Sequence, residues 1–268
     1  MATFEIFNAD CLEKMKDMPD KSVDLILCDL PYGCLTTGES KKKLNRADNP
    51  DKLNNREGVV AGCAWDIKID LEEFWKQIKR IRKDDYTPCI HFCNTKFGNE
   101  LINSNPKEFR YDLVWCKSNA VGFLSANKKP MSAHEMIYVF SKLGANYNRI
   151  DIQGDFPNTN IGNRGFKSSC YGLKPNTEKP NNEGKRCVKS WFEISNKKEK
   201  AGHPTAKPIE LYKWLITRYS KEGDVVLDPT AGSFNSGEVC RELNRSYIGI
   251  EMNKPFFDKG VERFKLNK

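Results

Sequence analysis

The sequence lacks the long apolar stretches and leader segments that direct proteins into or across membranes. None of its hydrophobic runs approaches the roughly 18 residues that a membrane-spanning helix needs. The first residues, Met1–Glu5, show no basic region followed by an apolar stretch, so we expect no secretion signal. We therefore expect a protein that has no membrane partner and works in the cytoplasm.

The sequence also lacks any Cys-x-x-Cys pair, although it contains ten cysteines. Several cysteines lie inside apolar, strand-like runs, as Cys28 and Cys116 do, which is typical of buried free thiols in a reducing compartment. The strongest metal candidate is the run in which Cys89, His91 and Cys93 would share one face of a strand. Structural zinc sites usually have four protein ligands, and no second cluster follows nearby, so we expect no metal.

Apolar residues make up 38% of the 268 positions and charged residues 30%, and the net charge is +8. A basic excess of this size is a weak indication of a polyanionic partner. Residues 145–202 contain eleven lysines and arginines against six acidic residues, so this stretch carries +5 of the total. It could be a solvated insertion or a substrate-docking region, and charge alone leaves both interpretations open.

Short β-branched and aromatic runs alternate with helical patterns along most of the chain. The predicted strands cover residues 3–8, 23–28, 88–93, 110–116, 135–141, 224–228 and 246–250. Helical spacing of apolar residues appears over 71–81, after Pro208 and after Pro255. This alternation predicts an α/β fold with a largely parallel sheet, whose ligands bind at the carboxyl ends of the strands.

Three short segments place polar groups where such ligands bind. Asp29–Gly33 (Asp-Leu-Pro-Tyr-Gly) directly follows a predicted strand. Asp228–Ser233 (Asp-Pro-Thr-Ala-Gly-Ser) is a small-residue loop between a buried strand and a helix expected from about Phe234, and such loops let backbone N–H groups approach a ligand. Glu251 follows Gly232 by 19 residues, a spacing suited to binding ribose hydroxyls, which indicates a nucleoside cofactor.

The third segment, His203–Pro208 (His-Pro-Thr-Ala-Lys-Pro), opens the predicted helix that precedes the small-residue loop. Thr205 is placed to cap that helix, and Pro208 suits its first turn. Lys207 offers a cation to a carboxylate. As isolated peptides, each of the three segments is no more than a turn or a helix start.

Together, and in this order, the three segments resemble the DNA amino-methyltransferases that use S-adenosylmethionine, in the arrangement where the catalytic motif precedes the cofactor motif. Asn8–Leu12 and Ser132–Glu135 are also similar to segments of that family. The resemblance spans about residues 1–142 and 203–252. It implies a circularly permuted, Rossmann-like, mostly parallel sheet of seven strands. Residues 1–144 would form the first catalytic part with a mobile loop at 34–64, residues 145–202 a target-recognition insertion, and residues 203–268 the cofactor-binding part.

The resemblance implies methyl transfer from S-adenosylmethionine to adenine N6 in double-stranded DNA. Asp29 and the carbonyl of Leu30 would accept the amino hydrogens, Pro31 would bend the motif, and Tyr32 would stack on a base flipped out of the duplex. The implied cofactor-binding residues are Asp10, Asp29, Thr205, Lys207, Asp228, Pro229, Ala231, Gly232, Ser233 and Glu251. Thr205 and Lys207 would meet the methionine carboxylate, and Glu251 the ribose. The implied DNA-binding residues are Lys41, Lys42, Lys43, Arg149, Arg164, Lys167, Lys185, Arg186 and Lys189.

Two positions depart from the family pattern, and more than one function stays open. Leu30 replaces a proline, and Phe234 replaces the second glycine of Gly-Ser-Gly, which we expect to narrow the loop or shift the cofactor. Cytosine-N4 enzymes usually carry serine at the position of Asp29, so Asp29 favours adenine. An inactive DNA-binding relative, or an enzyme that methylates RNA or protein glutamine, would also carry similar motifs. A cognate restriction enzyme and a homodimer are further expected partners.

Overall fold

The computed structural model describes residues 2–33, 68–154, 167–168, 172–173, 185–197 and 206–265. The chain divides into a large unit, Met1–Asn148 with Ser190–Lys268, and a small unit, Arg149–Lys189. The predicted mobile loop at 34–64, with Lys41, Lys42 and Lys43, lies outside the described residues. No helix in the part of the chain that the structure describes is long and apolar enough to cross a membrane.

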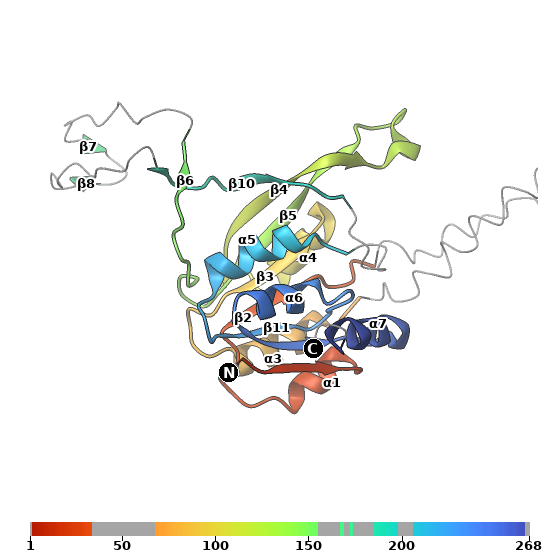
Figure 1. Ribbon diagram of the computed structural model, residues 1–268. Coiled ribbons are helices and arrows are strands. Elements are labelled where there is room, and N and C mark those ends of the chain that lie inside the picture. Colours follow the sequence, from red (N-terminus) through yellow and green to blue (C-terminus); the bar gives the residue numbers. More distant parts are fainter. Residues whose placement is uncertain are drawn as a thin grey trace, which may run out of the picture. The chain divides into compact units, whose positions relative to one another are not determined.

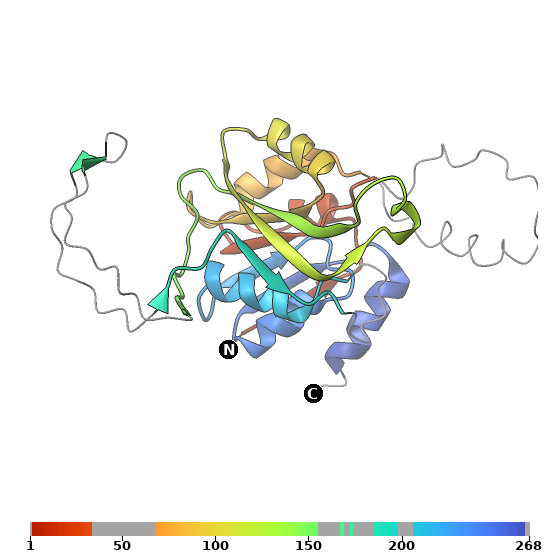
Figure 2. The same ribbon diagram turned by 90° about the horizontal axis from the view of Figure 1, so that it is seen from above.

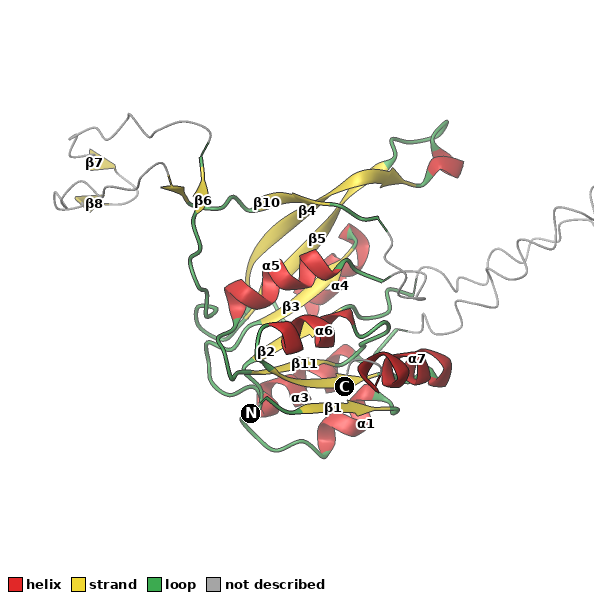
Figure 3. Cartoon of the chain, in the orientation of Figure 1, coloured by secondary structure: helices red, strands yellow, loops and turns green. Residues whose placement is uncertain are grey.

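The large unit is built on one eight-stranded sheet (Figures 1 and 3). In spatial order its strands are β1 (Phe4–Phe7), β12 (Ser246–Ile250), β11 (Val225–Asp228), β2 (Leu25–Cys28), β3 (Cys89–Cys93), β5 (Ser132–Phe140), β4 (Phe109–Val121) and β10 (Trp191–Ile194). Only β5 runs antiparallel to its neighbours, so the sheet is mostly parallel, as predicted. The first and last strands of the chain are adjacent, which is the permuted order that the sequence predicts.

Helices cover both faces of this sheet (Figure 2). They are α1 (Cys11–Lys16), α3 (Leu71–Ile81), α4 (Thr95–Ser104), α5 (Ile209–Tyr219), α6 (Asn235–Glu242) and α7 (Lys254–Lys265). Side chains alternate along each strand, so Ile26 of β2 packs with α1, α3 and α4, whereas Leu25 and Leu27 pack with α5 and α6. The predicted helix over 71–81 is confirmed, and its apolar residues Phe74, Trp75, Ile78 and Ile81 are buried.

Two predicted details of the large unit are wrong. The sheet has eight strands rather than seven, because Trp191–Ile194, inside the predicted insertion, forms the edge strand β10 beside β4. The residues of β10 alternate between exposed and half-buried, so one of its faces meets solvent and the run carries little apolar signal. The cap of α5 is Pro208, which precedes the first helical residue instead of lying in the first turn as predicted. Thr205, the predicted capping residue, lies outside the described residues.

The small unit contains two short antiparallel pairs. Strand β6 (Ile152–Gln153) pairs with β9 (Lys185–Arg186), and β7 (Lys167–Ser168) pairs with β8 (Gly172–Leu173). Two-residue strands supply few hydrogen bonds and little apolar burial, so this unit draws little stability from its described pairs.

Candidate active site

The candidate site lies at the carboxyl edge of the sheet, where the strands β1, β12, β11 and β2 end side by side. Asp29 directly follows β2, Asp228 ends β11, and Glu251 directly follows β12. Because these strands are parallel and adjacent, residues more than 200 positions apart meet at one edge. These residues lie far apart in the sequence, and the permuted strand order brings them together in space.

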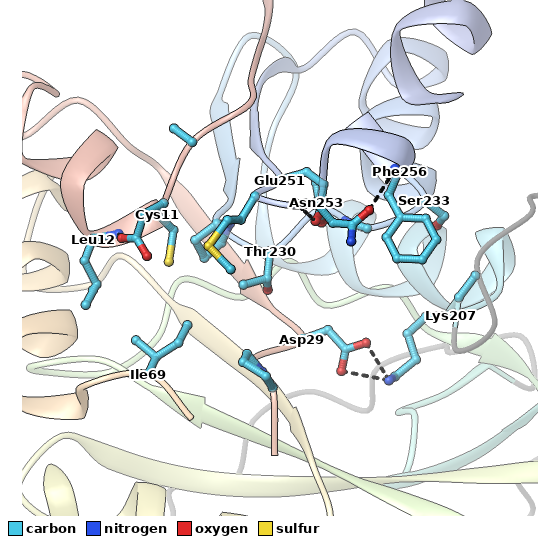
Figure 4. A pocket seen from close by; sticks show the side chains of 18 of the residues that line it. Cys11, Leu12, Asp29, Ile69, Lys207, Thr230, Ser233, Glu251, Asn253 and Phe256 are labelled. Atoms are coloured by element: carbon cyan, nitrogen blue, oxygen red, sulfur yellow. Dashed lines mark hydrogen bonds and ion pairs between the residues drawn. The ribbon is translucent and has the colours of Figure 1, made fainter. Parts of the chain in front are cut away.

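A cavity of about 400 Å³ opens at this edge (Figure 4), within the size range of small-molecule sites. Its lining includes eight of the ten predicted cofactor-binding residues: Asp10, Asp29, Lys207, Pro229, Ala231, Gly232, Ser233 and Glu251. Apolar side chains such as Leu12, Ile69 and Phe256 complete the wall. Of the two remaining predicted residues, Thr205 lies outside the described part of the chain, and Asp228 lies behind the wall.

The small-residue loop is fixed against the end of β12. Gly232 has φ 52°, a left-handed conformation that favours glycine, and its N–H donates to Glu251 Oε2 at 2.8 Å. The other oxygen, Oε1, accepts from the backbone N–H of Asn253 at 2.7 Å. Burial raises the pKa of Glu251 above its ordinary value, and the two N–H donors lower it again in part. Glu251 therefore holds the loop in place while its carboxylate faces the cavity.

Asp228 holds the small-residue loop from its buried side. It is 1% exposed, and it accepts hydrogen bonds from the backbone N–H of Thr230 at 3.2 Å and from Ser236 Oγ at 2.5 Å. Burial raises the pKa of Asp228 to about 7, although both hydrogen bonds lower it. Ser236 also contacts the hydroxyl of Tyr247 at 2.9 Å. Asp228 thus joins the start of α6 to the loop, a role that fits its absence from the cavity wall.

Phe234 does not line the cavity, and the effects expected of it, a narrower loop or a shifted cofactor, stay predictions. It caps α6 in a left-handed conformation, with φ 59° and ψ 25°, and its side chain is fully buried. The ring packs edge-on against Phe257 and Phe264 of α7, and a Cβ added at Gly260 would lie 2.2 Å from Phe234 Cδ2. The backbone therefore keeps the conformation in which glycine is usual, while the side chain points into the core.

Lys207 connects the catalytic motif to a carboxylate that sequence reasoning did not select. Its Nζ lies 2.8 Å from Asp29 Oδ1 and 2.7 Å from Asp29 Oδ2 (Figure 4), and 3.1 Å from Glu135 Oε1. The other oxygen of Glu135 lies 2.7 Å from Lys117 Nζ. In the structure, the cation that was expected to meet a ligand's carboxylate is paired with carboxylates of the chain itself.

Tyr32 closes this network. Its hydroxyl is 3.1 Å from both Asp29 Oδ1 and Glu135 Oε1, and its ring stacks on Phe97 with centroids 5.2 Å apart. The pKa of Tyr32 lies well above its ordinary value, because the group is buried and faces two carboxylates. The hydroxyl therefore stays protonated and donates. Leu30, between the two polar residues, is 2% exposed and anchors the motif in the core.

Neighbouring charges determine the pKa values of the ionisable side chains in this network. Burial raises the pKa of Asp29 above its ordinary value, Lys207 lowers it, and Glu135 raises it. Burial would also raise the pKa of Glu135, but Lys207 and Lys117 bring it below its ordinary value. Burial would lower the pKa of Lys207, yet Asp29 and Glu135 raise it. Two half-buried carboxylates and two lysines thus offset each other's charge in this network.

Glu135 and Lys117 were missed as site residues for a topological reason. Glu135 reaches the carboxyl edge of the sheet because β5 is antiparallel and begins there, opposite Trp115 of β4. A search for acids after parallel strands does not find a residue near the start of an antiparallel one. The available signal was the segment Ser132–Glu135, which resembles a family segment without a stated role.

The cavity offers polar groups that a ligand of the implied kind can use. Thr230 Oγ1 is buried and has no hydrogen-bond partner in the described structure. Such orphaned buried hydroxyls are uncommon, and a bound ligand with polar atoms would satisfy this one. Acidic groups, apolar walls and the glycine loop together fit a nucleoside with a charged tail, so the residues present fit S-adenosylmethionine.

A second cluster lies beneath the site, in the core. The side-chain ligand atoms of Cys28, Cys89 and His91 all lie within 4.8 Å of one another, and Cys89 Sγ contacts His91 Nε2 at 3.3 Å. Cys28, not the expected Cys93, completes the group, because β2 pairs with β3 and Cys28 lies opposite His91. Among the described residues this group offers three ligands, one fewer than a structural zinc site uses, and the absence of a metal stays a prediction.

The structure places five of the nine predicted DNA-binding residues in the small unit: Arg149, Lys167, Lys185, Arg186 and Lys189. Arg149 forms an ion pair with Asp151 at 2.6 Å, and Lys185, Arg186 and Lys189 are exposed. Arg164 lies outside the described residues, like Lys41, Lys42 and Lys43. The role of all nine in DNA binding stays a prediction.

Comparison with known proteins supplies the family. A family model described as DNA methylase matches residues 23–262. The chain is 28% identical to the Type II methyltransferase M.HinfI of Haemophilus influenzae, over 97% of this chain and 68% of that protein. It is also 28% identical to the DNA adenine methyltransferase YhdJ of Escherichia coli K12, over 97% of this chain and 82% of that protein.

Solved structures share the fold at low sequence identity. The PvuII DNA methyltransferase, named as cytosine-N4-specific, aligns with a TM-score of 0.64 and 14% identity over 98% of this chain and 87% of its own. The M1.HpyAVI–SAM complex aligns with a TM-score of 0.58 and 19% identity, over 97% and 99% of the two chains. Since the family match covers most of the sequence, including the catalytic motif and the cofactor loop, the chain belongs to the N6/N4 DNA methylase family.

Proposed function

We propose that this protein transfers a methyl group from S-adenosylmethionine to N6 of adenine at specific sites in double-stranded DNA. The observation that carries the proposal is the position of Asp29, whose carboxylate stands at the wall of the cavity with the loop Pro229–Ser233 on the same wall. The name of the relative YhdJ, a DNA adenine methyltransferase, supports adenine as the base. The cytosine-N4 specificity of the PvuII enzyme defines the alternative.

The cofactor, when bound, supplies an electrophilic methyl group, and the protein's own residues prepare the acceptor. The lone pair of adenine N6 is delocalised into the ring, so the amino group is a poor nucleophile. Asp29 and the carbonyl of Leu30 accept its two hydrogens and localise the lone pair, and Asp29 takes up the proton that N6 loses. This role needs an ionised Asp29, which Lys207 and the hydroxyl of Tyr32 favour against the effect of burial.

The ion pair between Lys207 and Asp29 has to loosen when the base enters. Lys207 occupies both oxygens of Asp29, so an incoming amino group replaces at least one of these contacts. Glu135 offers Lys207 a second anion 3.1 Å away, so the ammonium stays paired during the exchange. The ring of Tyr32 then supplies a face for the base, and positioning accounts for much of the rate.

Nucleotide-resolution mapping of genomic DNA from a host that expresses the chain tests the proposal. The expected result is N6-methyladenine at one short sequence, absent with Asp29→Ala and retained with Asp85→Ala, a control that removes an exposed carboxylate paired with Lys142. N4-methylcytosine would establish the alternative base. Methylation that survives Asp29→Ala would refute the mechanism, and DNA without any new methylation would refute the function.

The finer partners follow from the same proposal. The Type II name of relatives such as M.HinfI favours a restriction-linked role, in which an endonuclease reads the same sequence. Protection of the mapped sites from such an endonuclease tests that role. A homodimer stays a prediction, and sedimentation of the purified chain with and without DNA tests it.

A further inference from the structure

We propose that the tip of the β4–β5 hairpin, Val121–Met131, is a wedge that enters the DNA duplex beside the target base. This inference rests on the proposed function and extends it to the step that makes the base accessible. An enzyme that acts on a base inside a duplex has to unstack it, and apolar side chains inserted between base steps assist this in other DNA-binding proteins.

The first observation is an apolar tip that is open to solvent. After Gly122, whose φ is 93°, the chain turns through η3 (Phe123–Ser125), where Phe123 is 77% exposed and Leu124 is 94% exposed. Val121 and Met131 are exposed as well. Large apolar side chains that gather on a projecting turn are a usual mark of an interaction site.

The second observation is charge. From Ser118 to His134 the hairpin carries two lysines, Lys128 and Lys129, and no carboxylate. Both lysines are exposed, on the turn that follows η3. Apolar side chains beside cations suit the base stack and the phosphates of a duplex, because bases offer π faces and phosphates offer negative charge.

The third observation is continuity with the active site. The hairpin continues from Lys117 and Glu135, which pair with each other beside Lys207, and it extends beyond the body of the large unit (Figures 1 and 3). Glu135 lies three positions after Ser132 along β5, about 10 Å at the rise of a strand. The tip lies beyond Ser132, so it reaches on the order of the major-groove depth of about 8.5 Å past the site.

The test compares a tip variant with a matched control at the far end of the same strand. The tip variant combines Phe123→Ala and Leu124→Ala. The control is Leu143→Ala, which removes an exposed leucine, 47% exposed, three residues after β5 ends at the opposite edge of the sheet. Circular dichroism and cofactor binding should match the wild type for both variants, because neither site contributes to the core or to the cavity.

Single-turnover methylation is then measured on two duplexes containing the mapped site. In one the target base is paired, and in the other it faces an abasic position and is already unstacked. The tip variant should lose about ten-fold or more in rate on the paired duplex and little on the second, while the control keeps the wild-type rate on both. An unchanged rate on the paired duplex, or an equal loss on both, would overturn the wedge.

A binding measurement separates this proposal from the proposed function. Replacing Lys128 and Lys129 by glutamine should flatten the plot of the logarithm of the duplex-binding constant against the logarithm of the salt concentration. The magnitude of its slope should fall by about 0.9 for each phosphate that is no longer neutralised. If the wild type transfers no methyl group, the proposed function fails. The wedge is then tested by duplex binding alone: weaker binding of the tip variant supports it, and unchanged binding overturns it. A tip variant that binds and methylates normally but dissociates a dimer in sedimentation would assign the tip to a second copy instead.

Discussion

Lys207 and Asp29 form a two-point ion pair, in which one ammonium lies 2.7 and 2.8 Å from the two oxygens of one carboxylate. The residues are 178 positions apart and come from different elements at the carboxyl edge of the sheet. The same ammonium lies 3.1 Å from Glu135 Oε1, so one cation faces two carboxylates. The Asp29 carboxylate, the proposed catalytic group, is therefore already held in one orientation.

Replacing Lys207 by glutamine should destabilise the protein strongly. Lys207 is 7% exposed, and its loss would leave Asp29 and Glu135 facing each other without this cation. Removal of one partner from a buried ion pair costs about 3–5 kcal/mol. Without the cation the pKa of Asp29, already above its ordinary value, rises further, so the variant's stability should fall further as the pH rises. Urea unfolding at pH 5.5 and pH 8 measures both effects.

The matched control is Lys142→Gln, which breaks the exposed pair with Asp85. Exposed pairs contribute about 0–1 kcal/mol, and this control should show little dependence on pH. Equal losses for the two lysine variants would contradict the structural interpretation of the Lys207 network.

Two substitutions of Tyr32 should distinguish the contribution of its hydroxyl from that of its ring. Tyr32→Phe removes the hydroxyl contacts with Asp29 and Glu135 but keeps the ring stacked on Phe97, so we expect a stability loss of about 1 kcal/mol and modest loss of methyl transfer. Tyr32→Ala removes the face for the base and should cost about ten- to hundred-fold in rate. Single-turnover methylation with Tyr86→Ala as the exposed control measures this, and equal rates for Phe and Ala would exclude the stacking role.

Asp228→Asn should flatten the dependence of stability on pH. The folded pKa of Asp228, about 7, lies above its ordinary value of 3.8. Its contribution to stability is therefore fully present below about pH 4 and is lost as the pH rises through about 7, by roughly 4 kcal/mol. Asparagine has a single carbonyl oxygen and keeps one of the two hydrogen bonds that Asp228 accepts, but it carries no charge, so the variant should become the more stable protein above pH 7. Urea unfolding between pH 4 and 8 tests this, and identical profiles would contradict it.

Phe234 and Gly260 should show coupled effects on stability. Phe234→Gly relieves a left-handed phenylalanine, a gain of about 1–2 kcal/mol, but removes a fully buried ring, a loss of about 3–5 kcal/mol. Gly260→Ala should cost about 1–3 kcal/mol because its Cβ would meet that ring. In the Phe234→Gly background the same alanine should become neutral or stabilising, since the clash is gone and alanine favours helices. A double-mutant cycle measures the coupling, and additive losses would count against the contact.

Much of the fold follows from local patterns in the sequence. The strands that are buried on both sides, such as Leu25–Cys28 and Val225–Asp228, read as continuous apolar runs, and α3 shows its buried face in the spacing of its residues. Strand β10 escaped prediction because Trp191–Ile194 is short, lies at the sheet edge and has one solvated face. An edge strand needs no strong apolar pattern, since only one side of it is covered.

The residues of the candidate site that follow parallel strands could be predicted from the sequence. Those whose position depends on how distant segments pair or pack could not. Asp29, Gly232 and Glu251 could be selected from their positions after strands and their spacing. Glu135 could not, because its place depends on the antiparallel course of β5. The direction of the Phe234 side chain depends on the space left by Gly260 in α7, a residue 26 positions further along the chain, which no local pattern contains.

The pairing of β1 with β12 has a consequence for synthesis. A ribosome makes Phe4–Phe7 near the beginning and Ser246–Ile250 near the end, and β12 is the only sheet neighbour of β1 among the described residues. One wall of the cavity comes from Ala9–Leu12 and another from Glu251–Asn253 with Phe256. A nascent chain therefore has no complete cavity at this edge until Phe256 has left the exit tunnel. If this cavity holds the cofactor, as proposed, a truncated translation product that ends before β12 cannot modify DNA.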